Sequence, residues 1–307
     1  TSGVRIAVID SSCVLLQSES APYQIGLINP FDWRERCCTL IGRLKPDYRH
    51  RLKAIAVDGT SGTLLACDQQ GLPLAEALPY SFACPNFNAQ LQALSPQGGP
   101  ASSASGSLAR ALHLFDQHKA PLLLRHQADW ISGWLLENWS YGEEGNNLRL
   151  GWDLSKRAWP DSFISQPWWE ALPEIRVSGS VLGPISPQRA KDLDLPKDLL
   201  VVAGTTDSNA AVLTADADDD EGITVLGSTL VLKRFTDQPL LPGPGTSTHR
   251  VGGRWLCGGA SNAGAAVLKQ LFPDIDLAEL SRQIDPDQNS GLQLRPLPKC
   301  GERFPVD

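Results

Sequence analysis

Short runs of apolar, often β-branched residues alternate along this chain with longer segments in which apolar residues recur every three or four positions. The first run, residues 4–9, follows a Thr-Ser-Gly turn, and we expect it to be one arm of a hairpin whose other arm precedes the chain. Asn29 and Pro30 then form a helix start, a capping side chain followed by proline at the first helical position. The helix that they predict carries apolar residues at helical spacing: Trp33, Cys37, Leu40, Ile41 and Leu44.

Two further segments have the pattern of a hairpin, two apolar strands around a short turn that contains glycine. In the first, strands at 52–57 and 63–68 flank the turn 58–62, whose Asp-Gly pair is a strong hairpin signal. In the second, strands at 223–226 and 230–233 flank a Gly-Ser-Thr turn. With the opening Thr-Ser-Gly, these turns form a degenerate internal repeat.

Helices and one strand-to-helix junction complete the pattern. Ser107 is placed to cap one helix, and two helices are predicted from apolar residues at helical spacing: Leu108, Leu112 and Phe115 in the first, Ile131, Trp134 and Leu135 in the second. A strand at 199–203 ends at Gly204, and a helix begins at Asp207. We place the domain boundary there, between residues 1–203 and 204–307, and expect a further glycine turn at 258–262.

Net charge and composition limit the classes of partner that the protein is expected to bind. The 307 residues carry a net charge of −7, which disfavours nucleic acid or an anionic membrane surface as a partner. No apolar run approaches the roughly 18–20 residues that span a bilayer, and the seven cysteines lack CxxC spacing, which disfavours structural zinc or a disulfide framework. We therefore expect a cytoplasmic protein, or one of the chloroplast stroma in a plant, that binds a small neutral molecule.

A basic stretch straddles the end of the first predicted helix: Arg43, Lys45, Arg49, Arg51 and Lys53. A run of this kind at a helix end is usually solvated, and we favour that interpretation here. A phosphate-binding patch is the alternative.

The chemistry that best fits these features is phosphoryl transfer. It requires donors that hold phosphate oxygens, a magnesium ion held by few carboxylates, and a base beside the attacking hydroxyl. Glycine–hydroxyl turns supply such donors, and no GxxxxGK[ST] sequence is present. Asp207, at the start of a helix, suits the base, because the helix dipole and free N–H groups favour a carboxylate there; from position alone, a helix cap is the more common role.

Several segments resemble motifs of the FGGY carbohydrate kinase family. Residues 204–211, Gly-Thr-Thr-Asp-Ser-Asn-Ala-Ala, are similar to the motif whose Asp deprotonates the sugar hydroxyl. Thr1-Ser2-Gly3 with Arg5 resembles the tail of the first phosphate motif, and residues 227–229 resemble the second. Residues 145–153 resemble the family's Asn-Ala-x-x-x-Gly-Tyr-Asp segment.

This resemblance covers nearly the whole chain, and it implies an α/β, actin-like (ribonuclease-H-like) fold with two lobes and a ligand cleft between them. Residues 1–203 would be the sugar-binding lobe and 204–307 the nucleotide-binding lobe, each cut short at the chain's end. ATP and Mg²⁺ are the implied cofactors, with the acidic magnesium ligand preceding Thr1. The implied residues are Asp207 as catalytic base, Gly59, Thr60, Ser61 and Asp207 for the sugar, and Thr1, Ser2, Gly227, Ser228, Thr229, Gly258, Gly259 and Asn262 for ATP.

One departure from the family pattern bears on the substrate. The Asp-x-Arg that follows the second hairpin in xylulose and glycerol kinases is replaced here by residues 78–85, Leu-Pro-Tyr-Ser-Phe-Ala-Cys-Pro. This resembles the ribulose kinase branch of cyanobacteria and plants, so we expect phosphorylation of D-ribulose to D-ribulose 5-phosphate. The alternatives are a D-xylulose or polyol kinase, a non-catalytic sugar- or nucleotide-binding protein on the same scaffold, and an ATPase domain of the chaperone or actin type, which the segments at 145–153 and 204–211 disfavour.

Overall fold

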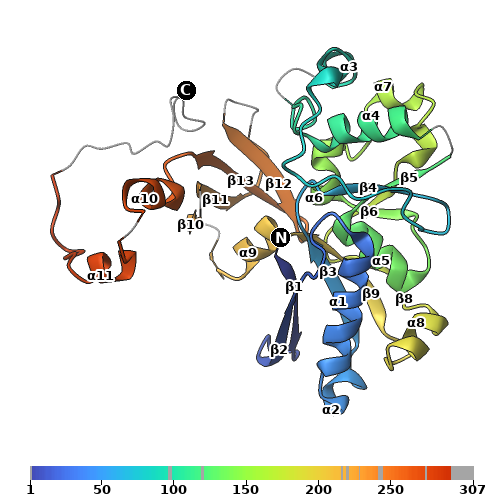
Figure 1. Cartoon of the computed structure of the whole chain (residues 1–307), viewed down its shortest axis with the longest axis horizontal. Helices are drawn as coiled ribbons and strands as arrows, with labels where there is room; N and C mark the ends of the chain where they lie inside the picture. The colour runs from blue at the N-terminus through green and yellow to red at the C-terminus, as the bar shows by residue number, and fades with distance from the viewer. Residues whose placement is uncertain are drawn as a thin grey trace. The chain divides into compact units, whose positions relative to one another are not determined.

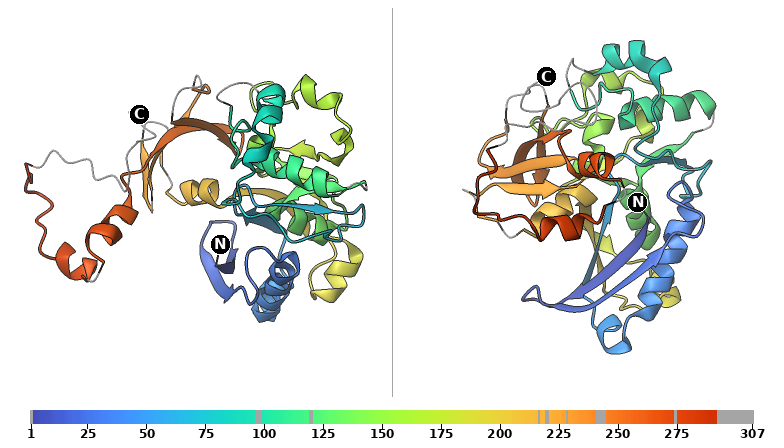
Figure 2. Two further views of the ribbon diagram at one scale, coloured as in Figure 1. Left: turned by 45° about the horizontal axis from the view of Figure 1, so that its top comes forward. Right: turned by 60° about the vertical axis from the view of Figure 1, so that its left-hand side comes forward.

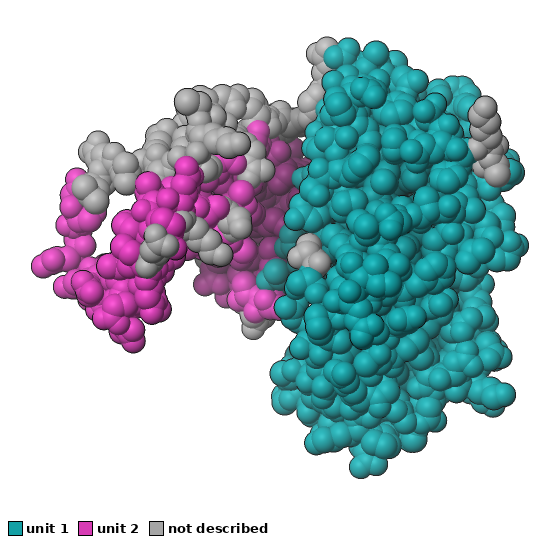
Figure 3. Space-filling model, in the orientation of Figure 1, with its two compact units in different colours: residues 1–211, 250–253 teal, residues 212–249, 254–307 magenta. Residues whose placement is uncertain are grey.

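The computed structural model of the chain (Figure 1) describes residues 2–95, 99–118, 121–215, 217–218, 221–227, 229–240, 245–273 and 275–291. It divides into two compact units, coloured separately in Figure 3. Unit 1 comprises Thr1–Ala211 with Arg250–Gly253, and unit 2 comprises Val212–His249 with Arg254–Asp307. Within the described residues no helix is both long and apolar enough to cross a bilayer.

Unit 1 begins with a hairpin that carries a long helix along its side (Figure 2). β1 (Gly3–Ile9) is the strand predicted from the opening run. It forms a hairpin with β2 (Leu15–Pro22), which follows it, whereas the predicted hairpin partner preceded it. α1 (Pro30–Arg43) begins as predicted, because Oδ1 of Asn29 accepts the N–H of Asp32 at 3.1 Å. Its face toward the core carries Trp33, which is 1% exposed, and a short α2 (Pro46–Arg49) follows.

The sheet that positions the candidate site has the order β3–β9–β8. β3 (Ala54–Gly59) and β9 (Leu200–Thr206) are parallel, and β8 (Val181–Pro184) pairs antiparallel with β9. α9 (Asp207–Leu213) follows β9 without a linker. The predicted strand-to-helix junction is thus present, although the strand continues past Gly204 to Thr206.

The predicted hairpin around residues 58–62 is wrong. β3 belongs to the sheet just described, whereas β4 (Leu64–Cys67) pairs with β5 (Leu123–His126) in a different sheet. An Asp-Gly hairpin turn requires positive φ at both positions, and neither Asp58 nor Gly59 has one. All four residues of β4 are buried, so distant apolar neighbours rather than the adjacent strand select its partner.

Helices cover these strands and contribute most of the buried aromatic residues. α4 (Ser107–Gln117) and α5 (Gln127–Leu136) are the two helices predicted from the sequence. The predicted cap is wrong: Gly106 is the N-cap, and Ser107 lies inside the helix with its hydroxyl turned to His126. The remaining elements of unit 1 are η1 (Pro85–Phe87), α3 (Asn88–Leu94), β6 (Tyr141–Glu143), α6 (Glu144–Asn147), η2 (Leu148–Leu150), α7 (Asp161–Ile164), η3 (Trp169–Ala171), β7 (Glu174–Arg176) and α8 (Pro187–Asp192).

Two tryptophans of α5 fill the core. Trp130 and Trp134 are 2% and 4% exposed, and Trp130 meets Trp33 edge-on at 6.0 Å between ring centroids. These indoles join helices α1 and α5 into one hydrophobic cluster.

Unit 2 is built on a sheet of order β10–β11–β13–β12. β10 (Ile223–Leu226) and β11 (Leu230–Thr236) form the predicted hairpin, and β12 (Thr246–Val251) and β13 (Arg254–Ser261) extend the sheet. The glycine turn expected at 258–262 is wrong, because β13 runs through Ser261 in register with β11. α10 (Ala265–Leu271) and α11 (Leu277–Ser281) follow.

Candidate active site

Asp207, the residue singled out from the sequence, is the first residue of α9. Because β3 and β9 run parallel, with Gly59 opposite Thr206, their carboxyl ends lie at the same edge of the sheet. The turn that begins at Gly59 and the carboxylate of Asp207 therefore start from neighbouring strand ends within unit 1. Asp207 is exposed, and its Oδ1 accepts the N–H of Ser208 at 2.7 Å.

A second carboxylate, that of Asp58, stands at the same edge. Its Oδ1 accepts the N–H of Thr205 at 2.7 Å, at the point where the β3–β9 register shifts. Gly204 has no room for a side chain, because a Cβ there would collide with the carbonyl of Val57 and lie 2.8 Å from Oδ1 of Asp58. Desolvation raises the pKa of Asp58, the Thr205 N–H lowers it, and the charge of Asp207 raises it again. The carboxylates of Asp58 and Asp207 are therefore close enough for the charge of one to affect the other.

The turn after β3, which carries the predicted sugar-binding residues, rests on the start of α5. Oε1 of Gln127 accepts the N–H of Thr60 at 3.0 Å, and the N–H of Gln127 donates to the carbonyl of Thr63 at 3.1 Å. Gly59 is needed for this packing, since a Cβ would lie 2.8 Å from the backbone nitrogen of Ala128. Thr60 is buried, whereas Ser61 is half-buried. Of this pair, Ser61 is the one with accessible surface for a ligand.

The segment that departs from the family pattern, residues 78–85, borders this turn through a buried arginine. Nη1 of Arg110 donates to the carbonyls of Tyr80, Phe82 and Ser105 at 3.2, 2.8 and 3.0 Å. Nη2 of Arg110 lies 3.0 Å from the position that a Cβ of Gly62 would occupy. Burial lowers the pKa of Arg110 to about 10. This residue was missed from the sequence, where it was one basic residue in an amphipathic helix.

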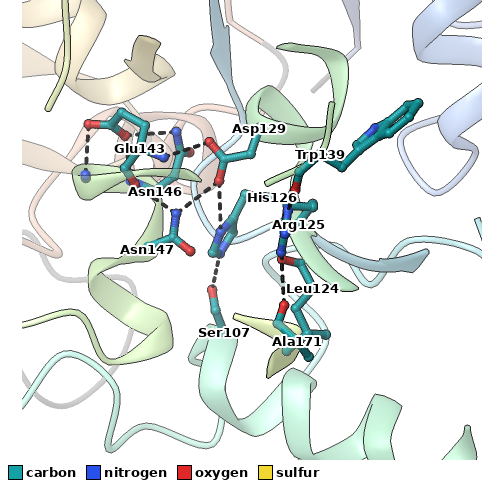
Figure 4. Close-up of polar contacts among 11 residues, drawn as sticks. Ser107, Leu124, Arg125, His126, Asp129, Trp139, Glu143, Asn146, Asn147 and Ala171 are labelled. Atoms are coloured by element: carbon teal, nitrogen blue, oxygen red, sulfur yellow. Dashed lines mark hydrogen bonds and ion pairs between the residues drawn. The ribbon is translucent and has the colours of Figure 1, made fainter. Parts of the chain in front are cut away.

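A buried network of polar side chains lies beneath the turn (Figure 4). Nε2 of His126 is 3.0 Å from the hydroxyl of Ser107, and its Nδ1 is 3.7 Å from Oδ2 of Asp129. The same oxygen of Asp129 accepts Nδ2 of Asn147 at 3.0 Å. All four side chains are at most 5% exposed. They link the start of α4 to the segment that resembles the family's Asn-Ala motif.

Glu143 is the last member of this network. It places the segment that resembles the family's Asn-Ala motif beside α9. Its carboxylate accepts the N–H groups of Gly145 and Asn146 at 2.8 Å, the side-chain amide of Asn146 at 2.9 Å and the hydroxyl of Ser178 at 2.9 Å. Burial raises the pKa of Glu143 to about 8, against the lowering effect of these donors. A Cβ at Gly145 would lie 3.3 Å from Nδ2 of Asn209, so the glycine permits a close approach to the helix that begins at Asp207.

In unit 2 the structure brings together part of the predicted ATP-binding set. The carbonyl of Gly227 accepts the N–H of Ala265 at 2.8 Å, and its N–H donates to the carbonyl of Thr229 at 3.0 Å. Asn262 directly follows β13, whose last residue pairs with the first residue of β11. The hairpin tip and the start of α10 are therefore adjacent.

The other predicted residues are placed differently. Gly258 and Gly259 lie within β13, opposite Lys233 and Leu232, and a Cβ at Gly258 would collide with the carbonyl of Leu232. Gly258 thus has a packing role in the strand. Ser2 precedes β1 in unit 1, where its carbonyl accepts the N–H of Tyr23 at 3.1 Å. Thr1 and Ser228 lie outside the described residues.

No protein-family model matches the chain. Its structure is similar to that of ligand-bound xylulose kinase from Lactobacillus acidophilus, with a TM-score of 0.74 and 16% identity over 89% of this chain and 61% of that one. It is also similar to xylulose kinase from Rhodospirillum rubrum (TM-score 0.79, 17% identity, 92% and 64%) and to Plasmodium falciparum glycerol kinase with ADP (0.76, 16%, 92% and 64%).

This likeness defines the fold. The chain has the α/β, actin-like fold of these carbohydrate kinases, which confirms the fold class predicted from the sequence. It spans less than two thirds of the length of these three kinases.

Proposed function

We propose that this chain acts as an ATP-dependent carbohydrate kinase, with residues 1–203 binding the sugar and 204–307 the nucleotide. The observation that carries the proposal is the parallel pairing of β3 with β9, which sets the Gly59–Thr60–Ser61 turn and the Asp207 carboxylate at adjacent strand ends. A sugar held on the turn would present a hydroxyl to Asp207. That the similar structures are named xylulose and glycerol kinases, one of them with ADP, supports the same chemistry.

In the proposed reaction, Asp207 accepts the proton of a sugar hydroxyl as its oxygen attacks the γ-phosphorus of ATP, and ADP leaves. The bond from the γ-phosphorus to the β,γ-bridging oxygen breaks as the new P–O bond forms. Asp58, whose carboxylate stands beside Asp207, is a hard oxygen donor that fits Mg²⁺, an ion usually held by one or two carboxylates together with substrate phosphates. Bound there, Mg²⁺ would neutralise phosphate charge.

The rival function is binding of a sugar or nucleotide without catalysis, because a fold does not fix an activity. ATP consumption that depends on an added ketopentose separates the two. We expect ADP to form with D-ribulose and not in its absence; binding of both ligands without ADP formation would favour the rival.

The nucleotide assignment predicts the behaviour of Gly227→Val. A Cβ at Gly227 would have the carbonyl oxygen of Thr229 as its nearest neighbour, at 3.7 Å, so the fold should tolerate the change. A side chain on the hairpin tip would block phosphate approach, and we expect the Kd for ATP to rise at least about tenfold with the sugar Kd unchanged. Calorimetry of both ligands measures this, with Gly222→Val, also in open space, as the matched control. Equal loss of both ligands would contradict the assignment.

The sugar assignment proposes a ketopentose, with D-ribulose ahead of D-xylulose, contacted by Ser61. Loss of one hydroxyl partner should raise the ketopentose KM about 2- to 10-fold in Ser61→Ala, with the ATP KM unchanged. Ser12→Ala, an exposed serine in the β1–β2 turn, is the control. The similarity to xylulose kinases accords equally with the D-xylulose alternative. Higher kcat/KM for D-xylulose or glycerol than for D-ribulose would overturn the ribulose assignment.

A further inference from the structure

Unit 1 contains an open hollow lined by residues of α1, α5 and α8 that shares no residue with the candidate active site. Its volume is about 480 Å³, within the range of pockets that bind small molecules. We call it the arginine hollow, after three residues of its lining, Arg34, Arg49 and Arg189. Cys38, Gly42 and Trp134 also line it, with Asp192 and Asp194 at the α8 side.

Two of the three arginines are fixed by carboxylates. Arg189 donates from Nη1 to Asp192 at 2.8 Å and from Nη2 to Glu137 at 3.0 Å, and it lies over the Trp134 ring at 5.8 Å. Arg49 pairs with Asp194. These contacts hold the guanidinium groups in place, so a ligand would lose little side-chain entropy on ordering them.

The third arginine has no such partner. Within the described part of the chain, Arg34 makes no ion pair, and its guanidinium is held over the ring of Phe31 at 5.2 Å. Three arginines and two aspartates line the hollow, so one positive charge lacks a counterion in the lining.

Arg34 and Arg189 line the same hollow as the half-buried Cys38. Burial raises the pKa of the Cys38 thiol, the guanidinium groups of Arg34 and Arg189 lower it, and Glu35 raises it. A negatively charged group placed over Cys38 would therefore face both arginines. Guanidinium groups bind phosphate in a bidentate manner, and a dianion gains most from a site with two of them.

We propose that the arginine hollow binds the phosphate group of a small phosphorylated metabolite, with Arg34 and Arg189 as its charged partners. The volume exceeds what inorganic phosphate alone would fill, which favours a phosphate ester. Arg49, which belongs to the basic stretch noted in the sequence, also lines the hollow and pairs there with Asp194.

Calorimetric titration of the full chain with D-ribose 5-phosphate, AMP, inorganic phosphate and citrate tests the proposal. Arg34→Ala removes the unpaired charge. Gly42→Phe fills the hollow, and it should leave the fold intact, because a Cβ at Gly42 meets nothing within 4 Å and glycine is unfavourable within a helix. Arg43→Ala, an exposed arginine on the same helix outside the hollow, is the matched control.

We expect the wild type and Arg43→Ala to bind at least one phosphate ester more tightly than citrate. Arg34→Ala should bind it about tenfold or more weakly, and Gly42→Phe should retain only binding that occurs elsewhere on the chain. Saturable binding by none of the phosphate probes, equal affinity in the wild type and Arg34→Ala, or an equal loss in Arg43→Ala would overturn the proposal. Tighter binding of citrate would overturn the choice of phosphate.

Discussion

An Asp207→Asn variant is expected to lose sugar-dependent ATP turnover by roughly 10²–10⁴-fold, the range typical of removing a general base. Asparagine has nearly the shape of aspartate, and its Oδ1 can still accept the Ser208 N–H, which Asp207 now does at 2.7 Å. The local structure should therefore persist while the proton acceptor is lost. A coupled assay of ADP formation gives the turnover, and thermal unfolding gives the state of the fold.

The matched control is Asp198→Asn, an exposed carboxylate just before the opposite end of β9. It changes the net charge by the same amount and leaves the edge that carries Asp207 untouched, so its turnover should equal that of the wild type. If Asp207→Asn keeps wild-type turnover and a wild-type melting temperature, Asp207 only starts a helix, and the proposed mechanism fails.

The elements that could be predicted from the sequence are those whose signals are local. Asn29 and Pro30 start α1 because both the cap and the proline act within one turn of helix. The β9–α9 junction is visible in the same way. Its placement of Asp207 beside the Gly59 turn, however, depends on the parallel pairing of β3 with β9, whose residues are more than 140 positions apart.

The predictions from sequence failed where a residue far away in the sequence determines which contact forms. Residues 58–62 look like a hairpin turn, yet the carboxylate of Asp58 bonds across the sheet to Thr205, and the following strand pairs with β5. Likewise, Ser107 is a good capping residue by type, but its hydroxyl meets His126. Polar side chains can satisfy several kinds of neighbour, so their sequence context alone does not say which bond forms.

The second large effect is expected at Arg110, because its guanidinium is buried without a carboxylate. Among the described residues no acidic group pairs with it, and the carbonyls of Tyr80, Phe82 and Ser105 supply its partners instead. The loop that contains Tyr80 and Phe82 packs beside the Gly62 turn, since a Cβ at Gly62 would lie 3.7 Å from Cβ of Tyr80. Arg110 thus fixes the segment that departs from the family pattern, at the proposed sugar site.

Arg110→Met keeps the length and removes the donors, so it leaves three carbonyls without their present partner. A hydrogen bond to a charged group contributes about 1.5–3 kcal/mol. The cost is partly offset because the arginine's own desolvation is relieved, and we expect a net loss of about 3 kcal/mol. For a unit of this size, that lowers the melting temperature by about 6–12 °C. Arg51→Met, at an exposed arginine, should stay within about 2 °C of the wild type.

The Arg110→Lys variant separates the effect of the positive charge from the effect of the guanidinium's hydrogen-bond geometry. An ammonium keeps the positive charge, but it cannot donate in the fixed fork of a guanidinium. If the hydrogen bonds to the carbonyls stabilise the loops, the melting temperature of Arg110→Lys should fall between those of the wild type and Arg110→Met. Both variants should raise the ketopentose KM more than the ATP KM, because the disturbed loops border Ser61 and Gly62. A melting temperature for Arg110→Met equal to that of Arg51→Met would show that the buried cation contributes nothing to this part of the fold.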